Sequence, residues 1–139
     1  MVGTIVNSDW WVSEQAAWSR AKQLAEGATL RLFSNNFTPT PASVVADFTE
    51  ATFSSYNAVD LTGIWGAPTQ VVAGDYLHVT SFAEFTSDDG TGQQIYGWYI
   101  TNDTPRVIHS GLLPAPVLMV DPQVLRIRIN YRDVAIVLL

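Results

Sequence analysis

Residues 30–56 read LRLFSNNFTPTPASVVADFTEATFSSY, and this stretch predicts a strand, a turn, a short helix and a second turn in close succession. Apolar residues at its start form a strand-like run, which Asn35 and Asn36 end because both tolerate left-handed backbone. Thr40 can accept hydrogen bonds from the free amides of a first helical turn. Pro41 suits the first helical position, where its missing N–H costs nothing. The pattern therefore predicts a short helix over Pro41–Phe48.

This short helix is expected to have one apolar side that buries Val44, Val45 and Phe48. Two carboxylates, Asp47 and Glu50, lie three residues apart at its exposed edge. They are predicted to be solvated or to cap the helix, because nothing in the pattern pairs them as a catalytic acid and base.

The segment LRLFSNNFTPTPASVVADFTEATF, residues 30–53, resembles a family of small structural proteins from the virion and tail-fibre gene clusters of tailed bacteriophages. The resemblance continues to about Gly63, and a weaker echo occurs in QIYGWYIT, residues 94–101. It implies an architectural role without a reaction: a virion protein that is not an enzyme and needs no cofactor.

The composition predicts one lightly charged globular domain. The chain has 139 residues, of which 47% are hydrophobic and only 14% charged, so it is long enough to bury a core and too apolar to be disordered. A net charge of −6 disfavours binding to nucleic acid. With no cysteine there is no disulfide framework. No signal peptide or membrane span is recognised, so we expect a soluble protein made in the host cytoplasm and incorporated into the virion.

Periodicity divides the chain into three parts: a helical appendage over 1–27, a β domain over 28–133 and an apolar tail over 134–139. The appendage is one helix from Asp9 to Glu26, ended by Gly27. The β domain alternates with a period of two between turn residues, which predicts an antiparallel β-sandwich or jelly-roll-like fold. The expected strands are 30–33, 58–62, 76–86, 94–101, 106–112, 117–120 and 124–131.

Within the β domain, residues 76–101 are expected to form a central hairpin. Its connection is Ser87–Gly92, in which Gly90 and Gly92 can both supply positive φ.

The two ends of the chain carry candidate contact residues. Trp10, Trp11 and Trp18 lie on the first helix, and the last two share a face. They either cover the open end of the sheet or anchor a partner. The tail, Val134-Ala135-Ile136-Val137-Leu138-Leu139, is either the last central strand or a strand donated to a neighbouring subunit.

Three of the seven basic residues share one strand face, because alternation over 124–132 separates Arg126, Arg128 and Arg132 from the apolar side chains. Two interpretations stay open. The stripe is either a solvated strand face or an electrostatic contact for an acidic partner, whose carboxylates suit arginine forks.

The sequence holds little chemistry. His78 and His109 lie in separate strands without a ligand at metal-binding spacing, so no metal site is expected. Asp88-Asp89-Gly90 reads as a turn, because it lacks the alternating ligands of a calcium loop.

The resemblance and these patterns predict a capsid decoration or cement protein that binds the major capsid protein or other virion proteins at subunit junctions. By analogy we expect a homo-oligomer, a trimer, without nucleic acid or membrane partners. The alternative is a tail-fibre or baseplate module in which Trp65, Tyr96, Trp98 and Tyr99 stack on a host-surface carbohydrate. A glycan-cleaving enzyme ranks last, because no pair of carboxylates is placed for it.

Overall fold

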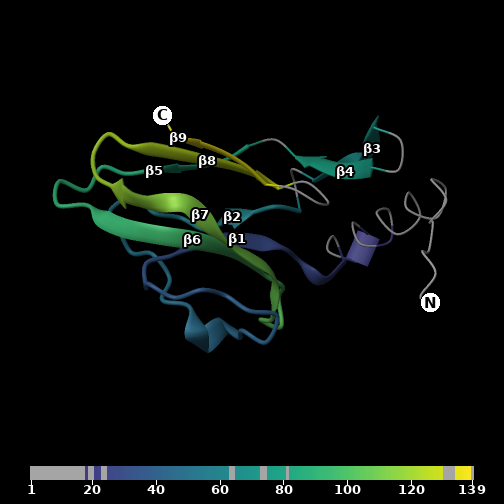
Figure 1. Ribbon diagram of the computed structural model, residues 1–139, viewed down its shortest axis with the longest axis horizontal. Helices are drawn as coiled ribbons and strands as arrows, with labels where there is room; N and C mark the ends of the chain where they lie inside the picture. The colour runs from purple at the N-terminus through teal and green to yellow at the C-terminus, as the bar shows by residue number, and fades with distance from the viewer. Residues whose placement is uncertain are drawn as a thin grey trace, which may run out of the picture.

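The structure is a computed structural model that describes residues 18, 21–22, 25–62, 65–72, 75–80, 82–129 and 134–138. It is mainly β, as the sequence predicted, with nine strands and almost no helix in the described part of the chain (Figure 1). The strands are β1 (Thr29–Phe33), β2 (Val59–Asp60), β3 (Trp65–Val72), β4 (Asp75–Thr80), β5 (Ala83–Thr86), β6 (Gln93–Thr101), β7 (Val107–Met119), β8 (Val124–Ile129) and β9 (Val134–Leu138).

The strands pair antiparallel in three sheets, with the orders β2-β1-β6-β7, β3-β4 and β5-β8-β9. Figure 1 shows the three-stranded sheet stacked over the four-stranded one. The main core lies between these two sheets, because alternate side chains of both enter one buried cluster. Leu30 and Leu32 of β1 enter it from one side, and Leu125 and Ile127 of β8 from the other.

A second, aromatic cluster lies on the opposite face of the four-stranded sheet. Alternation along β1 and β6 turns Phe33 and Tyr99 away from the main core, where they pack with Phe48. Phe37 also packs against this cluster. Figure 1 shows the chain between β1 and β2 hanging below the sheet on this face. The stretch that predicted strand, turn and helix thus folds back to cover its own strand.

The predicted short helix is wrong in extent. Residues 41–42 form a turn, and only Val45–Asp47 is helical, as a single turn of 3-10 helix. Thr40 is not the N-cap of a helix as predicted: its Oγ1 accepts the amide of Ala42 at 3.3 Å within the turn, and the residue that precedes the 3-10 turn is Val44. Phe48 is buried as expected, but Val44 is exposed. The backbone leaves helical geometry at Phe48 because Thr49 and Ala51 already pair with the edge of β1.

The predicted central hairpin is also wrong. The predicted strand over 76–86 is assigned as β4, which ends at Thr80, and β5, which begins at Ala83; β5 pairs with β8, while β6 pairs with β1 and β7. The connection 87–92 therefore crosses between sheets. Its polar side chains explain this path: Ser87 Oγ donates to the carbonyl of Met119 at 2.9 Å, and Asp89 Oδ2 accepts the amide of Ser54 at 3.3 Å. Both hydrogen bonds tie the connection to segments outside the predicted hairpin, to the end of β7 and to the loop before β2.

Two strands predicted over 106–112 and 117–120 are one long strand, β7. Ile95 pairs with Val117 and Gly97 with Leu112. Two residues along β6 therefore correspond to five residues along β7, which forms a bulge there. Pro114 and Pro116 lie in this bulge, where the strand needs no amide for the ladder. Strand β3, which contains Pro68, was not predicted.

Most of the predicted N-terminal helix lies outside the described residues. Five residues within it, 18, 21–22 and 25–26, have helical backbone, and Lys22 Nζ lies 2.9 Å from Glu26 Oε1, one turn apart. The helix as a whole stays a prediction. Gly27 follows with φ of +81°, which is the left-handed geometry expected of a helix-ending glycine.

Candidate functional site

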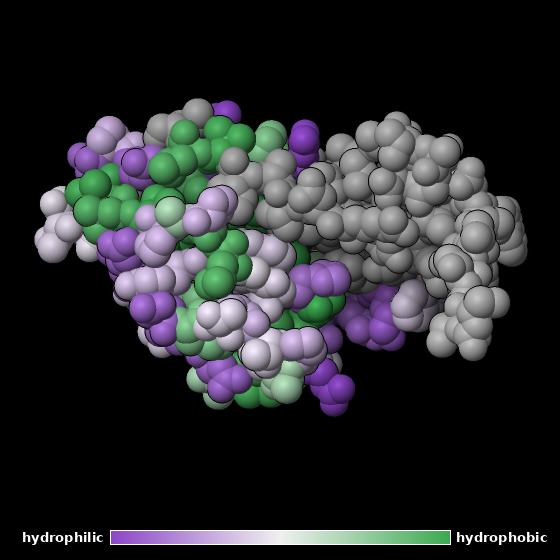
Figure 2. All heavy atoms as spheres, in the orientation of Figure 1, coloured by the Kyte–Doolittle hydropathy of each residue, from purple (hydrophilic) through white to green (hydrophobic). Residues whose placement is uncertain are grey.

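The candidate contact surface lies on the strands that end two of the sheets. β7 ends the four-stranded sheet and β9 the three-stranded one, and within the described residues neither has a second neighbour. Both expose large apolar side chains: Leu112 (46% exposed) and Leu118 (48%) on β7, and Val137 (37%) and Leu138 (51%) on β9. In Figure 2 hydrophobic surface gathers at the upper left, where Figure 1 draws β7, β8 and β9.

The tail is strand β9, which pairs with β8 of the same chain over its whole length, from Val134 opposite Ile129 to Leu138 opposite Leu125. It lies at the edge of its sheet and not at the centre. Leu139 lies outside the described residues. The tail is therefore anchored on one side by β8, and in the described part of the chain no strand pairs with its second side.

The arginine stripe has the predicted alternation: Leu125 and Ile127 are buried, and Arg126 and Arg128 are only partly buried between them. Arg126 Nε donates to Glu84 Oε2 at 2.8 Å, from the position directly opposite on β5. This exposed pair contributes about 1 kcal/mol or less to stability.

Arg128 has a different environment. Its guanidinium lies over the Phe82 ring, 4.9 Å from the centroid, and its buried Nε has no hydrogen-bond partner in the described part of the chain. Arg132 lies outside the described residues. The stripe is thus not uniform: the guanidinium of Arg126 is paired with a carboxylate, whereas among the described residues that of Arg128 contacts an aromatic face.

The predicted carbohydrate platform is not brought together. Trp98 (6% exposed) belongs to the main core and Tyr99 (2%) to the aromatic cluster, on opposite faces of the sheet. Neither ring offers a face to a sugar, and for these two residues the expectation is wrong. Tyr96 is half-buried against the aromatic cluster, and the side chain of Trp65 lies outside the description.

Of the three N-terminal tryptophans, only Trp18 is described. Its side chain is exposed, and Lys22 Nζ lies 5.6 Å from its ring centroid. Trp10 and Trp11 lie outside the described residues, so the choice between covering the sheet and anchoring a partner stays open.

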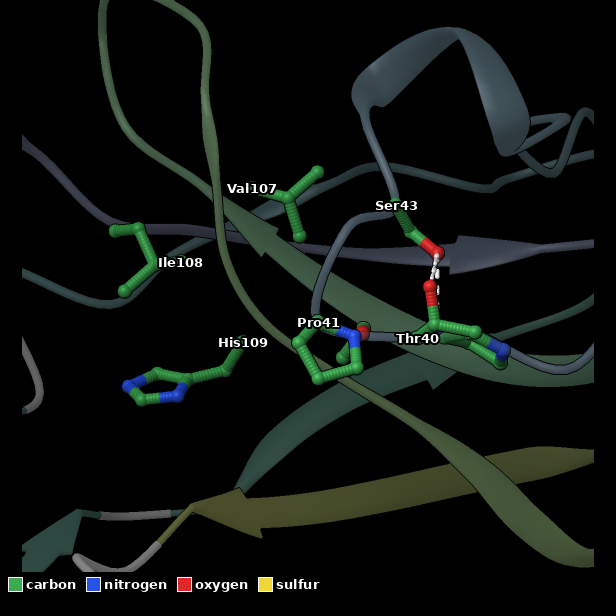
Figure 3. Close-up of a pocket in the computed structure, with 8 residues that line it drawn as sticks. Thr40, Pro41, Ser43, Val107, Ile108 and His109 are labelled. Atoms are coloured by element: carbon green, nitrogen blue, oxygen red, sulfur yellow. Dashed lines mark hydrogen bonds between the residues drawn. The ribbon is translucent and has the colours of Figure 1, made fainter.

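A pocket of about 320 Å³ separates the loop 39–43 from the first residues of β7 (Figure 3). Hydroxyl groups of Thr40, Ser43 and Ser110 are the polar atoms of its lining side chains, apart from the imidazole of His109. Ser43 Oγ accepts the amide of Thr40 at 2.8 Å. Figure 3 shows the His109 ring pointing away from Ser43 and Thr40, so the pocket holds no hydroxyl and imidazole pair. Desolvation lowers the pKa of His109 from its usual value.

The two carboxylates of residues 47–50 have separate structural roles. Asp47 Oδ2 accepts the amide of Val44 at 2.9 Å and caps the 3-10 turn, as predicted. Glu50 is not a solvated charge: its Oε1 lies 2.9 Å from Arg31 Nη1 and accepts the Tyr56 hydroxyl at 2.9 Å. Tyr56 in turn accepts the amide of Leu32. The network fastens the loop to the part of β1 that extends beyond its pairing with β2, and it gives no acid and base pair.

Metal chemistry finds no support in the described residues, where no three His, Asp or Glu side chains gather closely enough to hold an ion. The aspartates of the 88–90 turn are used locally, since Asp89 Oδ1 accepts the amides of Thr91 and Gly92 at 2.9 and 3.0 Å. These bonds lower the pKa of Asp89. Among the described residues no helix is long and apolar enough to cross a membrane.

Comparison with protein-family models, with curated proteins and with solved structures finds no match for this chain. Sequence reasoning missed four of the contact-surface residues: Phe82 and Glu84, which hold the two arginines, and Leu112 and Leu118 on β7. The signal for Glu84 was its alternation with the apolar residues Ala83 and Phe85, but only the pairing of β5 with β8 places it opposite Arg126.

Proposed function

We propose that this chain is a non-enzymatic structural protein of a tailed-phage virion. Its task is to decorate or cement the capsid by adhering to the major capsid protein or to other virion proteins at subunit junctions. In this proposal the two stacked sheets are a β-sandwich of jelly-roll type, and the N-terminal helix carries Trp10, Trp11 and Trp18 as further contact residues.

The observation that carries the proposal is the exposure of large apolar side chains on the two sheet edges. Four such side chains lie on β7 and β9, which have no second neighbouring strand among the described residues and so present an open edge there. An apolar surface beside open hydrogen-bonding groups is suited to protein contact, and single copies in water gain nothing from it. The resemblance of residues 30–53 to phage structural proteins is the reason for placing this contact in the virion.

The polar groups of the chain support the same function. Glu84 and Glu50 are used to hold Arg126 and Arg31, which stabilises the fold and leaves no paired carboxylates for hydrolysis among these residues. Adhesion needs no such pair. Many symmetric copies add avidity to an interface that is modest in a single copy.

The test is sedimentation of the purified protein with empty shells of the phage that encodes it. The wild-type protein is expected to pellet with shells to a saturating ratio. The variant Leu112→Asp with Leu118→Asp, which places two charges on the β7 edge, is expected to lose most of this binding. A matched control, Ala42→Asp with Val44→Asp, adds the same two charges at exposed positions of the loop and is expected to bind normally. Wild-type protein that remains in the supernatant contradicts the proposal.

The second candidate is a tail module that binds a host-surface carbohydrate, now at the hydroxyl-lined pocket in place of the buried rings. Thr40, Ser43 and Ser110 can donate to and accept from sugar hydroxyls there. Glycan-array binding by the wild type that is lost in Ser110→Val, with no shell binding in either protein, favours this candidate.

A further inference from the structure

We infer that β9 is a self-association strand: it pairs antiparallel with β9 of a second copy and joins two three-stranded sheets into one of six strands. The inference rests on the proposed function, because it supplies the interface of the proposed homo-oligomer. The oligomer is then a dimer about a two-fold axis, in place of the trimer that the resemblance implied.

The inference starts from a difference among the described edge strands. Natural sheets protect their edges with short strands, charged residues or proline. β2 has two residues, one of them Asp60; β5 has four, one of them Glu84; and β7 has Pro114 and Pro116. In the two-stranded sheet β3 contains Pro68, and β4 begins with Asp75.

β9 has none of these protections. Its sequence is VAIVL, without a charge, a proline or a glycine, and its pairing with β8 has no bulge. Val137 and Leu138 are exposed. An edge of this kind is a template for another extended, uncharged segment.

A second β9 has the chemistry that this edge requires. An antiparallel pair centred on Ile136 places Val134 opposite Leu138 and Ala135 opposite Val137, so every cross-strand pair is apolar. The same patch then serves both copies, which is the isologous arrangement of the commonest protein dimers.

The charge distribution also favours a second copy at this edge. Each chain carries a net charge of −6, so two copies repel over most of their surfaces. β9 contains no acidic residue, and its neighbour β8 carries Arg126 and Arg128. Glu84 lies two strands away from the edge and is neutralised by Arg126. Within residues 134–138 the two copies therefore pair without facing carboxylates.

A pair of five-residue strands is smaller than a standard interface of about 1,600 Å². We therefore expect a weak dimer that depends on concentration. Sedimentation velocity of the free protein between about 1 µM and about 1 mM covers the range from a tight to a marginal complex. No shells are present, so failure of this experiment is distinguishable from failure of the proposed function.

The discriminating variant is Val137→Glu. Residue 137 lies opposite Arg126 in the β8–β9 register, so a glutamate is compatible with the monomer, while in the dimer it places a charge next to the two-fold axis, in the apolar pair with Ala135 of the second copy. We expect the wild type to shift from monomer to dimer with concentration and Val137→Glu to remain monomeric. The matched control Leu118→Glu adds the same charge on β7 and is expected to dimerise like the wild type.

Hydrogen exchange provides a measurement without substitution. Amides of 134–138 are expected to gain protection at high concentration, while those of 107–112 on the β7 edge do not change. A wild type that is monomeric at all concentrations overturns the inference. Loss of the dimer in Leu118→Glu with retention in Val137→Glu, or a gain of protection on β7 alone, also overturns it.

Discussion

The ring of Phe48 is stacked on the ring of Tyr99, with centroids 4.3 Å apart and planes at 13°. Phe48 belongs to the loop that follows β1, and Tyr99 lies on β6, the strand beside β1. The stack fastens the loop to the outer face of the four-stranded sheet. Phe33 adds an edge-on contact to Phe48 at 5.3 Å. The phenylalanines Phe33, Phe37 and Phe48 of the 30–56 stretch thus form a small core with Tyr99, whereas Leu30 and Leu32 of the same stretch enter the core between the sheets.

Replacement of Phe48 by alanine is expected to destabilise the fold by about 3–5 kcal/mol, because it removes a buried ring and leaves a cavity between Phe33 and Tyr99. Urea unfolding measures this change. Val44→Ala, four residues earlier at an exposed position, is the control and is expected to change stability by about 0.5 kcal/mol or less. Equal effects of the two substitutions contradict the assignment of Phe48 to a core.

Tyr56→Phe is expected to destabilise the fold by about 1–3 kcal/mol, since the buried amide of Leu32 loses its acceptor and Glu50 loses a donor. Burial raises the pKa of Tyr56, consistent with a hydroxyl that stays protonated. Tyr96→Phe is the control, because the Tyr96 ring is half-buried and makes no described hydrogen bond through its hydroxyl. Its thermal unfolding temperature is expected to match the wild type, and a drop as large as that of Tyr56→Phe argues against the network.

Stability is expected to fall in alkali between pH 10 and about 12. Burial and the nearby Glu50 carboxylate raise the pKa of Tyr99 to about 12, whereas in the unfolded chain it ionises near 10. In this window the folded state binds more protons than the unfolded state, so the free energy of unfolding decreases as pH rises. Below pH 10 the contribution of Tyr99 is constant.

The measurement is the denaturant midpoint as a function of pH for the wild type and for Tyr99→Phe. The variant lacks the ionising group, so its midpoint is expected to fall less steeply between pH 10 and 12. Parallel curves for the two proteins exclude Tyr99 as a source of the alkaline loss.

Gly92→Ala is expected to destabilise the fold by at least about 1 kcal/mol, because Gly92 has φ of +81° and an added Cβ would lie 2.9 Å from Val120 Cβ. Gly90→Ala is the matched control two residues away. Gly90 does not have positive φ, contrary to the sequence expectation, and no atom lies within 4 Å of its added Cβ. Calorimetric unfolding is expected to separate the two variants, and a harmless Gly92→Ala argues against the described loop geometry.

The sequence determined the β character of the chain and several of its elements, because these depend on local periodicity. Alternation placed β1 and β6 within one residue of their observed ends and put Leu125 and Ile127 on the buried face of β8. Asp47 caps the 3-10 turn, as its residue type suggested. Each of these features is decided by residues within a few positions of one another.

Tertiary structure alone decided which strands pair and which side chains are left exposed. Asp89, Ser87 and Gln93 bind backbone groups more than 30 residues away, so a loop that looked like a hairpin connects two sheets. The alternation of residues 96–99 is compatible with either exposed or buried aromatic side chains. Trp98 and Tyr99 are buried because both faces of the sheet are covered, which only the tertiary packing decides. The sequence identified β9 as an apolar strand. Its place at a sheet edge depends on its pairing with β8 and on the lack of a second neighbouring strand within the described chain, and local sequence contains neither fact.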